Sequence, residues 1–213
     1  MIARIAVIAA SLALVGCASN YVVPTEGPTA SMRFVASTIW GGNVDVMHVP
    51  ETGICGWNGA PTFVNVRRIG TLNGIALDHR RQKLSLPGSE GLRDRDYTEI
   101  TIPAGRPFAF DISGHELGHP GTYSAPGTIT IVGGPRCNTT AEFTPENGRI
   151  YEAIFATMPF ENPTGCVISI TEIVSGAGGA VERRPEKSAR PREIQCNDGD
   201  LKIDRSSSVD KTP

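Results

Sequence analysis

The chain has 213 residues, a formal net charge of −2 at pH 7 and a calculated pI of about 6.1. This balance gives no basic face for binding nucleic acid, so we expect no nucleic-acid partner. With 24 glycines, 16 prolines and only 6% aromatic residues, the composition favours many short strands joined by tight turns over a helical bundle.

The first segment, residues 1–16, has the features of a signal peptide. Arg4 supplies a positive charge, and the apolar stretch 5–15 that follows is too short to span a bilayer as a helix. Leu14-Val15-Gly16-Cys17 ends this stretch. These four residues resemble the lipobox of bacterial lipoproteins. The alternative is an ordinary secretory signal peptide that contains a cysteine.

The resemblance to lipoproteins implies an address for the mature chain. In that family the cysteine thiol, here Cys17, carries lipid such as palmitate, and the chain is cut before it. Ala18 stands at the second mature position, where an aspartate would retain the protein in the inner membrane. The resemblance therefore implies a lipid anchor in the outer membrane, with the protein on its periplasmic face.

After the signal peptide, the pattern predicts a tether at 17–30 and one β-domain at 31–174. Short runs of alternating apolar and polar residues, separated by turns rich in Gly, Pro and Asn, predict about eight or nine strands. We expect them at 33–37, 44–49, 63–66, 97–102, 108–112, 128–132, 139–143, 150–157 and 166–173. The charged stretch 78–96 is expected to be a long exposed loop. This pattern is typical of an all-β fold, a β-sandwich.

Tyr151 gives a more specific indication. It stands just inside a predicted strand, after the Pro- and Gly-containing segment 143–149. This arrangement resembles the tyrosine corner of Greek-key sandwiches, although a plain strand tyrosine is an equal alternative. We expect an immunoglobulin-like or transthyretin-like sandwich. The chain resembles the many small uncharacterised β-sandwich lipoproteins of Gram-negative bacteria, a resemblance of architecture that implies no agreed function.

Four cysteines remain once Cys17 is assigned to lipid. In an oxidising compartment an even number predicts two disulfides, for which three connectivities are possible. We favour Cys137–Cys166, because both lie in strand-like segments within the same stretch of the domain, and this leaves Cys55–Cys196. Free buried thiols are the alternative.

The C-terminal region, residues 175–213, changes character. It opens with the Gly-rich stretch 175–180 and continues with basic and acidic residues in nearly equal numbers and few apolar side chains. This composition predicts a flexible linker followed by a largely disordered tail, pinned only where Cys196 forms a disulfide.

His115-Glu116-Leu117-Gly118-His119 matches the zincin signature. In that signature two histidines on one helix face bind Zn²⁺, and the glutamate is the general base for a metal-bound water. Gly114 and Gly118 weaken a helix here, and Pro120 disfavours helical geometry at His119. We therefore expect a loop, no catalytic residues and no cofactor. The alternative is zinc held by His115 and His119, with Glu116 as base in a peptidase or without catalysis in a metal-binding protein.

The sequence thus favours a lipid-anchored protein with a non-catalytic binding or scaffolding role. Its expected partners are the membrane, through the N-terminal lipid, and an envelope protein or cell-wall polymer. Trp40 and Trp57, each beside glycines, are either contact residues in loops or core residues.

Overall fold

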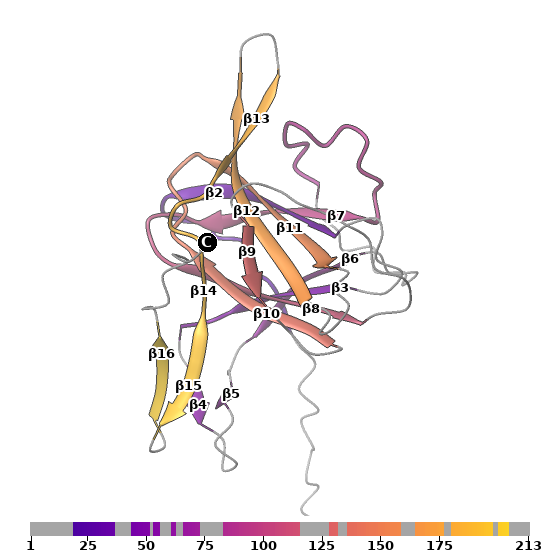
Figure 1. Ribbon diagram of the computed structural model, residues 1–213. Coiled ribbons are helices and arrows are strands. Elements are labelled where there is room, and N and C mark those ends of the chain that lie inside the picture. The colour runs from indigo at the N-terminus through magenta and orange to yellow at the C-terminus, as the bar shows by residue number, and fades with distance from the viewer. Residues whose placement is uncertain are drawn as a thin grey trace, which may run out of the picture.

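The computed structural model describes residues 19–36, 44–51, 53–55, 61–62, 66–72, 83–115, 128–131, 136–158, 165–176, 180–197 and 200–204. Every regular element in these ranges is a β-strand (Figure 1). None of the described residues belongs to a helix long and apolar enough to cross a bilayer. The predicted all-β class is confirmed.

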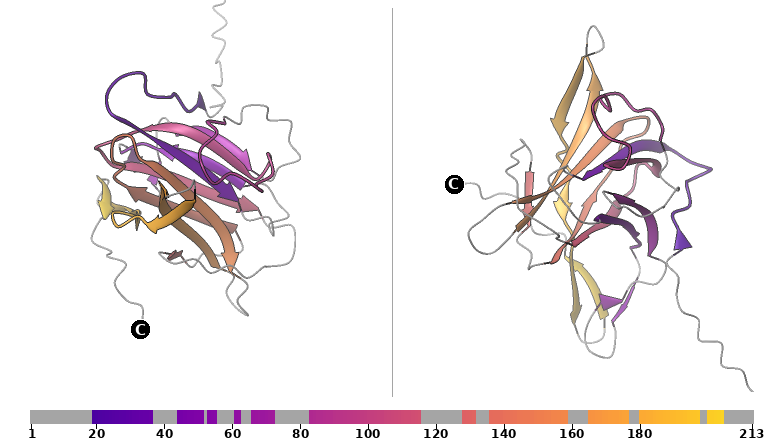
Figure 2. Two further views of the ribbon diagram at one scale, coloured as in Figure 1. Left: turned by 90° about the horizontal axis from the view of Figure 1, so that it is seen from above. Right: turned by 90° about the vertical axis from the view of Figure 1, so that its right-hand side faces the viewer.

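The strands form two main sheets, which lie as stacked layers (Figure 2). The first sheet has the order β1 (Ser19–Asn20), β6 (Arg67–Leu72), β3 (Val44–Val49), β8 (Phe108–His115), β10 (Arg136–Phe143) and β14 (Arg190–Pro191). The second has the order β13 (Val181–Pro185), β12 (Gly165–Ser175), β11 (Ile150–Met158), β2 (Thr29–Ala36) and β7 (Tyr97–Pro103), with β9 (Thr128–Ile131) also paired to β12. The sandwich is therefore established, while its immunoglobulin-like or transthyretin-like subtype stays a prediction.

Two short ribbons lie outside the sheets. One pairs β4 (Ile54–Cys55) with β5 (Pro61–Thr62), and the other pairs β15 (Glu193–Asn197) with β16 (Asp200–Asp204). The ribbons contact each other and project from one end of the sandwich (Figure 1). We call these two ribbons the projecting lobe.

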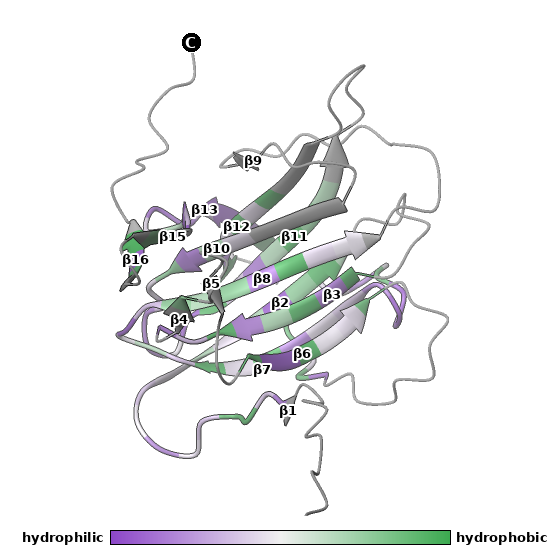
Figure 3. Cartoon of the chain, turned by 90° about the horizontal axis from the view of Figure 1, so that it is seen from below, coloured by the Kyte–Doolittle hydropathy of each residue, from purple (hydrophilic) through white to green (hydrophobic). Residues whose placement is uncertain are grey.

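The core lies between the two sheets and follows the alternation of the strands. Figure 3 shows apolar and polar residues following one another along β3. The inward-facing side chains include Met32, Phe34 and Ala36 of β2 and Phe108, Phe110 and Ile112 of β8. Alternate residues point to opposite faces, so one face of each sheet enters the core.

Tyr151 forms the predicted tyrosine corner. Its hydroxyl oxygen accepts a hydrogen bond of 2.9 Å from the backbone N–H of Glu146, five residues upstream. The ring is buried, at 1% exposure, and packs edge-on against Phe143 with centroids 5.0 Å apart. The residue therefore fixes the corner and fills the core. Burial raises the pKa of its phenol.

The prediction of a flexible tether at 17–30 is wrong for the residues that the structure describes. Ser19 and Asn20 pair with Arg67 and Arg68 as the edge strand β1. Tyr21 packs against the core, and β2 begins at Thr29. The segment suggested a tether because it contains Pro24, Gly27 and Pro28. One partly buried aromatic ring and the strand pairing are enough to attach it to the domain.

The prediction of a largely disordered tail at 175–213 is also wrong for its central part, because residues 181–204 contain β13 to β16. β13 pairs with the edge of β12, and β14 pairs with β10, so the tail passes from one sheet to the other. Arg190 shows why the charge pattern misled: it binds the buried carboxylate of Glu142 at 2.7 Å. Arg183 and Arg190 of the tail are therefore neutralised by carboxylates of the domain and not by solvent.

Two smaller differences concern β6 and the loop. β6 was not predicted, because its sequence does not alternate cleanly between apolar and polar residues. In the structure its register with β3 shifts between Val46 and Met47. Residues 83–96 contain no strand, as expected, but the loop is only partly exposed, because Leu86 and Asp96 are buried.

Candidate functional site

The zincin-like motif begins on a strand. His115 is the last residue of β8, and its backbone is the register partner of Arg136 in β10. Glu116 and His119 lie outside the described residues, as does the side chain of His115. A zincin needs a helix that brings both histidines to one face, and the described part of this segment is extended instead. The described residues contain no group of three or more potential His, Cys, Asp or Glu ligands, and the zinc hypotheses stay predictions.

One predicted disulfide is present. Cys55 of β4 and Cys196 of β15 are bonded, with their Cα atoms 5.7 Å apart and a sequence separation of 141. The bond joins the two ribbons of the projecting lobe. Cys137 and Cys166 lie on β10 and β12, in different sheets, but their side chains lie outside the described residues, as does Cys17. The second disulfide and the lipidation stay predictions.

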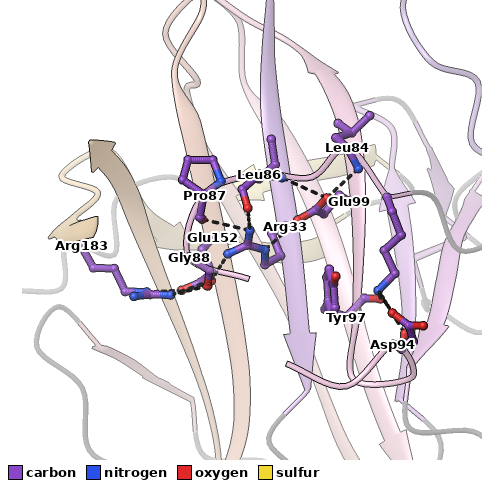
Figure 4. Close-up of polar contacts among 11 residues, drawn as sticks. Arg33, Leu84, Leu86, Pro87, Gly88, Asp94, Tyr97, Glu99, Glu152 and Arg183 are labelled. Atoms are coloured by element: carbon purple, nitrogen blue, oxygen red, sulfur yellow. Dashed lines mark hydrogen bonds and ion pairs between the residues drawn. The ribbon is translucent and has the colours of Figure 1, made fainter. Parts of the chain in front are cut away.

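The largest buried polar cluster surrounds Arg33 on the outer face of the second sheet (Figure 4). Arg33 is the register partner of Glu99 on β7 and of Glu152 on β11, so the three side chains form one row across three strands. Its guanidinium binds Glu99 at 2.9 Å and Glu152 at 3.0 Å. All three residues are at most 1% exposed. A buried arginine is tolerated here because two carboxylates neutralise and orient it.

The loop 83–96 covers this row and supplies its remaining partners. Arg33 donates hydrogen bonds to the carbonyl oxygens of Leu86, at 2.6 Å, and Pro87, at 3.0 Å. Glu99 accepts from the N–H groups of Leu84 and Leu86. Ser85 between them has a φ of 57°, a left-handed conformation that turns both amides toward one oxygen.

Arg183 of β13 completes the cluster from the tail. It donates to Glu152 at 2.6 Å and to the carbonyl oxygen of Gly88 at 3.3 Å. Two arginines and two glutamates balance in charge, and their polar atoms are directed at one another and at the loop backbone. We therefore interpret the cluster as a clamp that holds the loop and the tail on the sheet, and not as a reactive centre.

The outer face of the first sheet carries two aspartates bonded to threonines. Asp45 accepts from Thr71 at 2.6 Å, and Asp111 accepts from Thr140 at 3.2 Å. Burial raises the pKa of Asp111 to about 6, and the Thr140 hydrogen bond opposes this rise. Asp111 is therefore a proton-binding group whose charge changes near neutral pH.

A third polar region lies at the edge of the first sheet, where the described chain begins. Tyr21 makes edge contacts with the rings of His48, at 5.4 Å, and Phe108, at 6.2 Å, and His48 stacks on Phe108 at 5.2 Å. Burial, together with the charges of Arg192, Arg67 and Arg106, lowers the pKa of His48 to about 4. The imidazole is therefore neutral at physiological pH.

Arginines lie near these rings, since Arg67, Arg106 and Arg192 all lower the pKa of His48. Arg67 and Arg68 pair directly with β1, and Arg106 lies close enough to lower the pKa of Tyr21, although burial dominates and raises that pKa to about 12. Arg68 and Arg106 are exposed. Val22, next to Tyr21, is 65% exposed, the largest exposure among the large apolar side chains of the described part. We call Val22, Arg67, Arg68 and Arg106 the basic edge.

Sequence reasoning missed the Arg33 cluster and the basic edge. Each depends on which strands become neighbours, which the alternation of a strand does not reveal. The pair Arg67-Arg68 was the one local signal for the edge, but it is informative only once β1 is known to pair with it.

Comparisons with protein-family models, with curated proteins and with solved structures find no match for this chain. The function must therefore be argued from its own residues.

Proposed function

We propose that this protein is a lipid-anchored lipoprotein of the outer membrane, held on the periplasmic face, with a non-catalytic binding or scaffolding role. The anchor is Cys17, which follows Leu14-Val15-Gly16 at the end of the signal peptide. Its partners are the membrane, through the lipid, and an envelope protein or cell-wall polymer.

The Cys55–Cys196 disulfide is the observation that carries this proposal. Structural disulfides persist in oxidising compartments such as the bacterial periplasm and are rare in the cytosol. The bond also supports a binding role, because it fixes the projecting lobe, which extends from the sandwich and is available to a partner (Figure 1).

The pairing of buried charges supports a non-catalytic role. A catalytic acid or base needs a titratable group directed at a substrate. Glu99 and Glu152 are instead directed at Arg33, and Glu142 is directed at Arg190. These carboxylates hold the sandwich together.

The anchor is tested by expressing the full chain and a Cys17→Ala variant in a Gram-negative host with labelled palmitate. We expect label in the wild type only, and the wild-type protein in the outer-membrane fraction after density separation. A wild-type chain that carries no label and no lipid on Cys17 would contradict the proposal.

The non-catalytic role is tested by elemental analysis of zinc in the wild type and in a His115→Ala/His119→Ala variant. We expect no stoichiometric zinc in either protein. Bound zinc that is lost in the variant, together with peptidase activity that is lost in Glu116→Gln, would replace the scaffolding role by a zinc peptidase.

A further inference from the structure

The proposed lipid attachment site lies immediately next to the folded domain. Ser19 of β1 is the register partner of Arg67 in β6, at the edge of the first sheet, and Tyr21 donates its backbone N–H to the carbonyl oxygen of Arg68 at 2.8 Å. Ser19 is only two positions after Cys17 in sequence. Two residues span at most about 7 Å even when fully extended. A lipid on Cys17 therefore leaves no spacer between the bilayer and this edge.

The side chains at this edge suit the surface of a bilayer. Arg68 and Arg106 are exposed cations, and Val22 is an exposed aliphatic side chain on the segment that follows β1. Figure 3 shows β1 at the outer edge of the molecule. Arginines attract anionic headgroups, and an apolar side chain beside them enters the headgroup region.

We propose that the basic edge, Val22, Arg67, Arg68 and Arg106, docks the sandwich directly on anionic phospholipid headgroups. This inference rests on the proposed lipidation of Cys17. A basic patch beside a lipid anchor adds a second attachment to the bilayer. The edge would thus orient the whole domain, with β1 toward the bilayer and β14, at the opposite edge of the first sheet, away from it.

Two acidic residues at this end of the sandwich limit the attraction and sharpen the test. Glu26 is exposed on the segment between β1 and β2, and Glu51 is exposed shortly after β3. Anionic headgroups repel these carboxylates. Neutralising Glu26 should therefore strengthen docking, whereas neutralising Arg68 and Arg106 should weaken it.

The test is hydrogen exchange, followed by mass spectrometry, on the full acylated protein in vesicles. One set of vesicles contains phosphatidylcholine alone, and the other contains phosphatidylcholine mixed with phosphatidylglycerol. The informative amides are the backbone N–H groups of Val22 and Val23, in the segment between β1 and β2. We expect slower exchange at these amides in the anionic vesicles, and loss of the difference at high salt, which screens exposed charges.

Variants test the residues. We expect Arg68→Gln/Arg106→Gln to reduce the docked population by roughly five-fold for each arginine removed, and Glu26→Gln to increase it. Lys187→Gln is the matched control. Lys187 is exposed on the segment between β13 and β14, which are the edge strands of the two sheets, and β14 lies opposite β1. This substitution should not change the docked population.

Equal exchange in the two kinds of vesicle, with no response to the arginine variants, would overturn the docking. The mass of the N-terminal peptide distinguishes this result from failure of the proposed function. An acylated Cys17 without protection overturns the docking alone, whereas an unacylated Cys17 overturns the lipoprotein proposal and the docking that depends on it.

Discussion

Replacing Arg33 by methionine tests whether the buried cluster holds the loop and the tail on the sandwich. The substitution keeps a long side chain of similar volume but removes the charge and its hydrogen bonds. Glu99 and Glu152 lose ion pairs of 2.9 Å and 3.0 Å, and the carbonyl oxygens of Leu86 and Pro87 lose their donors.

The expected cost is large, because a negative charge remains buried without its main partner. Removing one member of a buried ion pair destabilises a protein by about 3–5 kcal/mol. Glu99 keeps two backbone donors, and Glu152 keeps Arg183. These remaining contacts place the expected loss near the lower bound, at about 3 kcal/mol. Adding Glu99→Gln to Arg33→Met should recover part of this loss, since it removes the uncompensated charge.

The assay is urea unfolding of the wild type, the two single variants and the double variant at neutral pH. Arg149→Gln is the control, because Arg149 forms a half-exposed ion pair with Glu172 at 2.8 Å, and such pairs contribute at most about 1 kcal/mol. Brief trypsin treatment adds a local readout. Arg93 and Arg95 are exposed on the loop, so a detached loop should be cut there first.

A loss below about 1 kcal/mol for Arg33→Met, with no faster cleavage in the loop, would refute this reasoning. It would mean that the carboxylates find other partners or water, and that the loop is held by Leu86 and its apolar contacts instead.

Three further predictions concern protonation and the disulfide. His48 has a folded pKa of about 4, below its ordinary 6.5, so its contribution to stability is complete above pH 6.5 and is lost as pH falls toward 4. His48→Gln should therefore remove about 3 kcal/mol of acid sensitivity in urea titrations across this range. The pH dependence that Asp111 gives to stability has the opposite sign. Its pKa is raised from 3.8 to about 6, so the folded protein loses stability as pH rises through that interval. Asp111→Asn should therefore stabilise the protein by about 3 kcal/mol near pH 8 and by little near pH 4, as measured by thermal unfolding at both pH values. An equal effect at both pH values would exclude titration as the cause. Cys55→Ser/Cys196→Ser should lower the free energy of unfolding by about 2–5 kcal/mol, because the bond joins residues with a sequence separation of 141. Non-reducing peptide mapping of the wild type should show whether Cys137 and Cys166 are also joined.

The sequence by itself determined several strands of the sandwich and the faces they present to the core. The alternation of apolar and polar residues predicted the strands at 44–49, 97–102 and 150–157 close to their observed bounds, because side-chain direction has period two in any strand. Tyr151 after its Pro- and Gly-containing corner, and Cys196 as a partner for Cys55, were also readable, since each depends on local chemistry or on counting cysteines.

Only the tertiary structure decided which strands become neighbours. These neighbours determined the buried charge pairs and the ordering of the tail and the N-terminal segment. Arg33 lies 66 residues from Glu99 and 119 from Glu152, so no local pattern reveals that the three form one row. The same reason explains why the tail and the N-terminal segment are ordered. Their polar composition predicts solvation, but Arg183, Arg190 and Tyr21 find partners on distant strands. Whether a charged side chain is solvated or paired depends on its surroundings, and only the fold supplies these surroundings.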